Sequence, residues 1–414
     1  MNALSPLRFK RKSGTGNGYQ KDSRRHGYGF TLIEILVGMV IGMIGIIVVM
    51  QVFALFEGQK RTTSGGGEAQ NTGAIALSSI SDDIRQAGYG FSLINLIGCS
   101  VELRTSPTTV TLNVLAPVMI NPVSIPAGDA NTDTLQIAYG NSNLLPEGNS
   151  IVAPPIDTTH FSVQAYKSFN VGDYVLATPL GRSCTVAHPA TLNQVAAVTN
   201  PTLTLTPGVG VSVTPGLLFN LGQTVTIHVY AVRNGNLTVC DYMVNDCGDP
   251  NKVSPLDSTV WVPIAGNIVS LRAQYGQDIT NNQPSVTSPN TGLMDGVVDI
   301  YSQTSPANTG ASKDACDWLR IPSIRLALVA RNSQLEKTAV TAAAPLWDGS
   351  TAANNNPVWT GSTAGASANP IDLSQYPNGT ANPNWQNYRY KVFQTTLPIR
   401  NITSSVSLGV ASGC

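Results

Sequence analysis

Charged side chains are scarce in this sequence of 414 residues, where Asp, Glu, Lys and Arg together make up 12%. Basic and acidic residues number 24 each, so the formal net charge is zero. Seven of the basic residues lie within residues 1–29, and the others form no basic stripe of the kind that binds nucleic acid. The composition therefore argues against a nucleic-acid partner.

Motifs of catalysis and cofactor binding are also missing. The chain has no phosphate-binding loop, no dinucleotide fingerprint and no nucleophile elbow. Its four histidines are scattered along the sequence: His26, His160, His188 and His228. We therefore predict that the protein is not an enzyme and has no catalytic residues and no cofactor.

One apolar stretch stands out. Residues 30–50 carry a single charge, Glu34, and no proline, and the apolar character continues to Phe56. A helix of this length, roughly 40 Å, crosses a bilayer. A carboxylate near one end of such a segment costs a few kcal/mol in lipid unless it meets a partner. Glu34 is therefore a candidate functional residue whose partner must be found.

The sequence around Glu34, Gly29-Phe30-Thr31-Leu32-Ile33-Glu34, resembles the processing site of type IV prepilins and type II secretion pseudopilins. The resemblance implies that a prepilin peptidase cleaves after Gly29 and methylates the new amino terminus at Phe30. It also implies that Glu34 pairs with the amino terminus of a neighbouring subunit. Two other interpretations are an ordinary signal anchor and a secretory signal cleaved near residues 52–54.

Residues 1–29 read as a basic prepilin leader, with seven Lys or Arg against one Asp. Such a bias before a first membrane helix keeps that end in the cytoplasm, so the bulk of the chain is expected in the periplasm. A nucleic-acid-binding arm is the rival interpretation. Removing the leader would leave 17 basic and 23 acidic residues, a formal charge near −6.

A membrane helix is expected over residues 30–62. A second helical segment is expected over residues 63–90, with its pattern starting at Glu68 after a break at Gly65-Gly66-Gly67. In the first, Gly38 and Gly42 form a small-xxx-small pair that lets helices approach closely, or reflect the usual glycine content of membrane helices. In the second, one face carries Leu77, Ile80, Ile84 and Ala87.

From residue 91 to residue 414 the pattern changes to short β-type runs between turn signals, which predicts an α+β, pilin-like fold with a large β-rich domain. A low-complexity insertion is expected near residues 338–385. Asn234-Gly235 predicts a type I′ hairpin turn. The expected strands are 109–115, 134–138, 174–178, 194–198, 224–232, 236–242, 268–274, 296–301, 324–330 and 391–397.

Four further segments resemble PilW-type minor pilins in their sequential order, whereas residues 100–220 align with nothing. The segments are 82–90 (DDIRQAGYG), 262–276 (VPIAGNIVSLRAQYG), 324–331 (IRLALVAR) and 393–401 (FQTTLPIRN). The resemblance implies a minor pilin that helps to initiate type IV pilus assembly, a process linked to adhesion and twitching motility.

That function has expected partners and rivals. The partners are the membrane, the prepilin peptidase, other minor and major pilins and the inner-membrane assembly platform. The protein would be a single-pass inner-membrane protein before it joins the pilus or its tip. The alternatives are a minor pseudopilin of a type II secretion system and a membrane-anchored periplasmic binding or adhesion module.

Six cysteines favour disulfides in a periplasmic domain. Cys240 and Cys247 close a short loop and are expected to pair, whereas Cys99, Cys184, Cys316 and Cys414 cannot be assigned. Three acids on the loop that follows the expected hairpin, Asp241, Asp246 and Asp249, are either calcium ligands or ordinary turn residues. The absence of an EF-hand pattern favours turn residues, so we predict no metal site.

Overall fold

A computed structural model describes residues 29–92, 95–104, 110–142, 148–152, 157–179, 189–208, 215–253, 258–278, 297–307, 312–347 and 371–402. The leader before residue 29, Cys184, Cys414 and the middle of the expected insertion lie outside these ranges. The chain divides into two compact units, residues 1–60 and residues 61–414.

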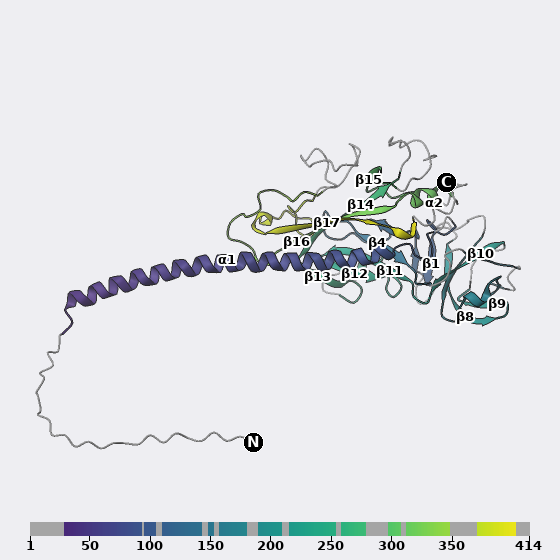
Figure 1. Cartoon of the computed structure of the whole chain (residues 1–414), viewed down its shortest axis with the longest axis horizontal. Coiled ribbons are helices and arrows are strands. Elements are labelled where there is room, and N and C mark those ends of the chain that lie inside the picture. Colours follow the sequence, from purple (N-terminus) through teal and green to yellow (C-terminus); the bar gives the residue numbers. More distant parts are fainter. Residues whose placement is uncertain are drawn as a thin grey trace, which may run out of the picture. The chain divides into compact units, whose positions relative to one another are not determined.

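The first unit consists of the N-terminal part of α1 (Leu32–Gln86), drawn in purple in Figure 1. Thr31 caps this helix: the backbone N–H of Glu34 lies 3.0 Å from the Thr31 carbonyl oxygen and 3.3 Å from its Oγ1. Side-chain and backbone oxygens at this position satisfy amides that have no partner within the helix. The helix therefore begins at Leu32, three residues after Gly29.

The expected break at Gly65-Gly66-Gly67 is wrong, because α1 continues through all three glycines. Each glycine weakens a helix by about 1 kcal/mol relative to alanine. Tertiary packing outweighs this cost, since every third or fourth residue of this part of α1 is buried in the second unit. The buried residues are Gly65, Ala69, Gly73, Ala76, Ile80, Ser81, Asp83 and Ile84, followed just beyond the helix by Ala87.

Small residues on this face let the helix approach the domain closely. A Cβ at Gly65 would lie 3.2 Å from the Cβ of Asn332, and a Cβ at Gly73 would overlap the ring of Phe393. The helix ends before Gly88, whose φ of +81° favours glycine. Asn401 donates from its Nδ2 to the carbonyl oxygens of Gln86 and Ala87, at 3.0 Å each, and so caps the helix end.

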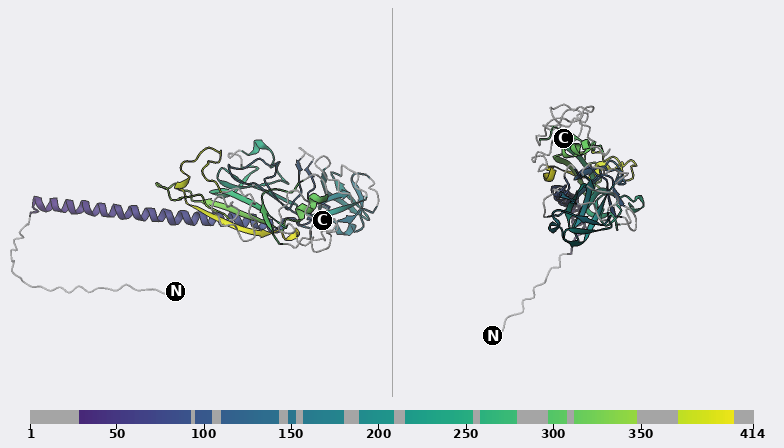
Figure 2. Two further views of the ribbon diagram at one scale, coloured as in Figure 1. Left: turned by 90° about the horizontal axis from the view of Figure 1, so that it is seen from above. Right: turned by 90° about the vertical axis from the view of Figure 1, so that its right-hand side faces the viewer.

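Three sheets build the β-rich part of the second unit. The first contains eight strands, with β9 (Thr202–Thr206) joining β8 to β6 (His160–Ser162). Its main path runs β2 (Val110–Leu112), β1 (Val101–Arg104), β8 (Ala190–Thr199), β7 (Tyr174–Pro179), β10 (Gly216–Gly222) and β5 (Asn149–Ser150). Figure 1 shows β1, β8, β9 and β10 at one end of the unit, and the left view of Figure 2 shows teal strands at that end.

The second sheet runs β13 (Val262–Gly266), β12 (Asn236–Asp241), β11 (Thr226–Arg233), β4 (Leu135–Tyr139) and β3 (Val118–Ile120). The third runs β15 (Ile300–Ser302), β14 (Ile268–Gln277), β16 (Ser323–Arg331) and β17 (Tyr390–Pro398). The short helix α2 (Ser312–Leu319) precedes β16. Among the described residues, 3₁₀ turns cover Tyr166–Ser168, Pro250–Lys252 and Trp385–Asn387.

Successive side chains of a strand point to opposite faces of its sheet, so the hydrophobic core is divided into layers. Tyr230 and Val232 of β11 face a core shared with α1 and the third sheet, whereas Val229 and Ala231 face a core shared with the first sheet. Further cores lie beyond the first and third sheets. A buried ion pair links the second and third sheets: Arg272 Nη1 lies 3.3 Å from Asp133 Oδ1. The second sheet is therefore covered on both faces.

All ten expected strands overlap observed ones, although residues 109 and 296 lie outside the described ranges. The expected hairpin is confirmed. Strands β11 and β12 pair with Arg233 opposite Asn236, and Asn234 and Gly235 have φ of +51° and +69°. Positive φ at both central residues defines the type I′ turn. The strands β1, β3, β5, β6, β9, β10 and β13 were not expected.

Two glycines of α1 provide a matched test of the packing. Gly73→Ala places a methyl group inside the Phe393 ring, so we expect it to destabilise the second unit by about 1–3 kcal/mol. Gly67→Ala points into open space and should stabilise it by about 0.5–1 kcal/mol through helix propensity. Urea unfolding of the full chain in detergent, followed by tryptophan fluorescence, measures both. Equal changes of the same sign would contradict the packing account.

Candidate functional site

The first turns of α1 present an apolar surface to the surroundings. Phe30 and Leu32 are each 78% exposed, and the large hydrophobic side chains onward to Phe56 are all more than two-fifths exposed. Glu34 lies in the first helical turn, where the partial positive charge of the helix terminus favours a carboxylate. Among described residues, α1 is the one helix long and apolar enough to cross a membrane, judged by length and composition.

A stripe of glycines continues from Glu34 along the helix. Gly38, Gly42 and Gly45 follow Glu34 at spacings of four, four and three residues, which places all four on one helical face. No atom of the described chain lies within 4 Å of a Cβ built at any of these glycines. Backbones approach closely over such a surface. The structure thus brings the predicted residues Glu34, Gly38 and Gly42 together on an uncovered face.

A second cluster, which sequence analysis missed, surrounds Asp83 of α1. The Asp83 carboxylate accepts hydrogen bonds from the Tyr139 hydroxyl at 2.8 Å and the Tyr230 hydroxyl at 2.6 Å, and pairs with His228 Nδ1 at 2.7 Å. Only 11% of the Asp83 side chain is exposed. Tyr139 belongs to β4, and His228 and Tyr230 belong to β11. The cluster therefore links α1 to the second sheet through hydrogen bonds.

Hydrogen bonding decides the ionisation of this cluster. Burial alone would raise the pKa of Asp83, but bonds from His228, Tyr230 and Tyr139 lower it overall. The hydrogen bond and negative charge of Asp83 raise the pKa of His228, and the charge of Asp241 adds to this effect. Burial and the Asp83 charge raise the pKa of both tyrosines well above their usual value. An ionised Asp83 beside a protonated His228 is therefore favoured.

The predicted pairing of Cys240 with Cys247 is confirmed, with a Cα–Cα distance of 5.9 Å. Cys99 and Cys316 are also disulfide-bonded. Each acid in and just after the Cys240–Cys247 loop caps its own turn: Asp241, Asp246 and Asp249 accept from the backbone N–H groups two residues later. Within the described ranges no three His, Cys, Asp or Glu side chains converge on a possible metal position.

Two family models match the chain. Residues 24–50 match the prokaryotic N-terminal methylation motif. This match and the apolar helix indicate a membrane-anchored component of the type IV pilin class. Residues 240–401 match the family described as type IV pilus-assembly protein W, PilW. The two matches together support a PilW-like type IV minor pilin.

Both matched families are structural components of pili rather than enzymes, and they imply contacts with other pilins and the pilus machinery. No curated protein and no solved structure matches the chain. The PilW match covers the whole third sheet and α2, including the segments 262–276, 324–331 and 393–401. Strands β14, β16 and β17 are neighbours, so these segments come together in one sheet.

The Asp83 cluster predicts how stability depends on pH. His228 has a higher pKa in the folded chain than in the unfolded chain, where it is about 6.5. Its contribution to the free energy of unfolding is therefore complete at pH values below 6.5 and is lost as the pH rises through the folded pKa. Asp83 has a lower pKa in the folded chain than its unfolded value of about 3.8. Its contribution to the free energy of unfolding is therefore complete at pH values above 3.8 and is lost as the pH falls through the folded pKa. The cluster therefore contributes most in the mildly acidic range.

His228→Gln tests this dependence. We expect the variant to lose roughly 1–2 kcal/mol of unfolding free energy at mildly acidic pH, with a smaller loss at alkaline pH. Unfolding measured across the pH range gives the difference. His160→Gln is the matched control, because its ion pair with Asp157 is largely exposed and contributes little. A loss from His228→Gln that is the same at every pH would contradict the account.

Proposed function

We propose that this chain acts as a minor pilin in the initiation of type IV pilus assembly. Prepilin peptidase cleaves after Gly29 and methylates the amino terminus of Phe30. The mature chain is held in the inner membrane by α1, with its amino terminus at the cytoplasmic side and its β-rich unit in the periplasm. It then enters the pilus or its tip through contacts with other minor and major pilins and the assembly platform.

The position of Glu34 carries this proposal. It is the single charge among residues 30–56, and it lies in the first turn of a helix whose apolar side chains are exposed. An unpaired carboxylate in lipid is costly, so a positive partner at the same depth stabilises it. The amino terminus at Phe30 of an adjacent subunit supplies that charge, because a methylated amine remains protonated. Pairing of the two groups would set the register between subunits.

The glycines on the same face supply the second part of the mechanism. Gly38 and Gly42 leave a strip without side chains, where another apolar helix approaches closely and gains van der Waals contact. Charge pairing at one end and close packing along the strip select neighbouring pilin helices over lipid. Assembly would thus depend on binding within the membrane and on no catalytic residue of this chain.

The size of the remaining chain favours a minor subunit. Residues 91–414 form a β-rich portion that would crowd a filament in which the same subunit repeats every few ångströms. A pseudopilin of a type II secretion system shares the N-terminal features and is the nearer alternative, but the PilW match over residues 240–401 favours the pilus. A membrane-anchored binding module that never enters a filament is the other alternative.

Glu34→Gln tests the proposal, since it preserves side-chain shape and removes the charge. We expect normal membrane insertion, a strong loss of surface pili and reduced twitching motility. Glu57→Gln is the matched control: it makes the same change in the same helix outside the motif and should leave piliation near normal. Pilus counts by electron microscopy and membrane fractionation measure the two effects.

Two results would overturn the proposal. Normal piliation in Glu34→Gln would show that the charge does not act in assembly and would favour the anchored module. Normal piliation together with loss of secreted enzymes would assign the chain to a type II secretion system.

A further inference from the structure

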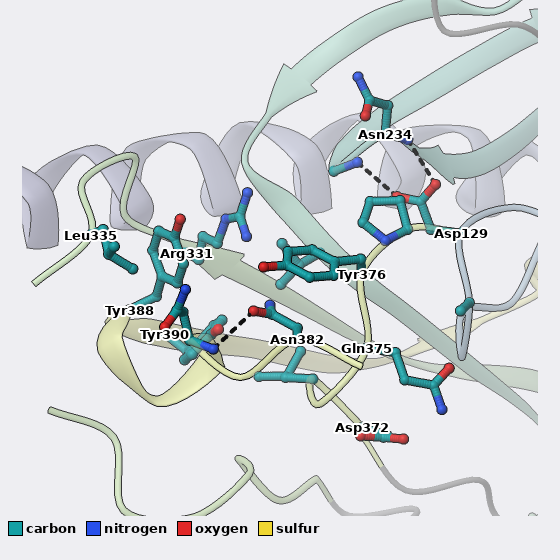
Figure 3. A pocket seen from close by; sticks show the side chains of 16 residues that line it. Asp129, Asn234, Arg331, Leu335, Asp372, Gln375, Tyr376, Asn382, Tyr388 and Tyr390 are labelled. Atoms are coloured by element: carbon teal, nitrogen blue, oxygen red, sulfur yellow. Dashed lines mark hydrogen bonds between the residues drawn. The ribbon is translucent and has the colours of Figure 1, made fainter. Parts of the chain in front are cut away.

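A pocket of about 250 Å³ lies on the second unit, and none of the residues proposed to act in assembly lines it. One wall is formed by the segment from Asp372 to Tyr390, and the opposite wall by Asp129 and the β11–β12 turn. Figure 3 shows Tyr376 at the centre, with Arg331 and Tyr388 to one side and Asp129 to the other. These residues come from distant parts of the chain and meet only in the fold.

Aromatic and amide groups dominate the chemistry of this pocket. Three tyrosines line it, Tyr376, Tyr388 and Tyr390, and Tyr376 is 41% exposed. In the described part of the chain, the hydroxyls of Tyr376 and Tyr388 form no hydrogen bond. The same holds there for the amide side chains of Asn234, Gln375 and Asn384, which also line the pocket. Flat apolar rings beside uncommitted amides suit a ligand with C–H faces and hydroxyl edges.

The charges in the pocket disfavour an anionic ligand. Two carboxylates, Asp129 and Asp372, and one guanidinium, Arg331, line the pocket. Arg331 is partly committed, because its guanidinium carbon lies 4.5 Å from the centre of the Tyr388 ring. The Arg331 Nε finds no hydrogen-bond partner within the described ranges. The remaining negative charge repels phosphates and carboxylates, whereas carboxylate oxygens and an Arg donor hydrogen-bond well to neutral hydroxyls.

The walls are held in place before any ligand binds. The Tyr390 hydroxyl donates to the Trp385 carbonyl oxygen at 2.8 Å, and the Asn382 backbone N–H donates to the Ser374 carbonyl oxygen at 2.8 Å. Asp129 accepts from the backbone N–H groups of Asn234 and Gly235 at 2.7 Å each. Fixed walls reduce the ordering that a ligand must impose, which permits useful affinity for a small polar molecule.

We propose that this pocket binds one ring of a neutral saccharide, a hexose or an N-acetylhexosamine, with Tyr376 stacked on the C–H face of the sugar. The volume lies just below the range of about 300–1,000 Å³ that holds drug-sized ligands, which fits a single ring better than a peptide or a nucleotide. The pocket would give the protein a glycan-binding activity in addition to its role in assembly, and the two are independent.

Saturation-transfer difference NMR on the full chain tests the pocket. The probes are D-glucose, D-galactose, D-mannose and N-acetyl-D-glucosamine at millimolar concentrations, with N-acetylneuraminic acid as the anionic comparison. The protein is held in lauryldimethylamine oxide, because a maltoside detergent would itself compete for a sugar site. We expect at least one neutral sugar to bind, and the sialic acid to bind more weakly.

Variants connect that binding to the pocket. Tyr376→Ala removes the exposed ring and should weaken binding roughly tenfold, whereas Tyr376→Phe keeps the ring and should retain most of it. Tyr89→Ala is the matched control, because Tyr89 is 39% exposed and does not line the pocket. Unchanged circular dichroism of each variant shows that the fold is kept.

Three results would overturn the proposal: no neutral sugar binds the wild-type chain, the sialic acid binds more tightly than the neutral sugars, or Tyr376→Ala binds as tightly as Tyr89→Ala. Pilus assembly does not enter these measurements. A negative result in the sugar-binding experiments therefore does not affect the proposed function. Normal piliation of Glu34→Gln likewise does not affect the proposed glycan site.

Discussion

Close approach between α1 and the two sheets beside it is the constraint on which the second unit depends. The helix surface is flat where Asn332 and Phe393 pack on it, because its buried residues there are small: Gly65, Ala69, Gly73 and Ala76. Farther along, Ile80 and Ile84 fill the core between the second and third sheets. The Asp83 cluster then fixes one side of the helix, and Asn401 caps its end. A helix with larger residues on this face would have to move away from both sheets.

The match to PilW covers only part of the second unit. The third sheet, whose β17 contacts α1 at Gly73, lies within the matched residues 240–401. The eight-stranded first sheet lies between residues 101 and 222, outside both matches. Figure 1 shows its strands β8, β9 and β10 gathered apart from β14, β16 and β17. The matched part thus forms one packing surface for the helix. The other surface includes β4 and β11 of the second sheet, which lie outside both matches, as does the first sheet.

Local patterns predicted much of this structure from sequence. Three features depend on residues close together in the chain: the apolar run, the helical face of residues 77–87 and the Asn-Gly turn. The structure agrees with the predictions made for each of them. The methylation motif is local in the same way, which is why residues 29–34 suffice to suggest a pilin. Cys240 and Cys247 are close enough in sequence for their pairing to be predicted.

Long-range packing accounts for what could not be predicted. Helix propensity argued for a break at Gly65-Gly66-Gly67, but the Asn332 and Phe393 contacts that favour glycine on this face lie more than 260 residues away. Asp83 and His228 are 145 positions apart, so nothing near either one signals their pairing. The walls of the glycan pocket are similarly distant, since Asp129 and Tyr376 meet only in the fold. The unexpected strands are mostly short and pair with distant partners.

The mass of the N-terminal peptide of the mature protein, purified from membranes of a host with an active prepilin peptidase, tests the central claim most directly. The account predicts a chain that begins at Phe30 and carries one methyl group on its α-amine. A chain that retains residues 1–29 would contradict it, because Glu34 would then lack the amino-terminal partner on which the proposed assembly depends.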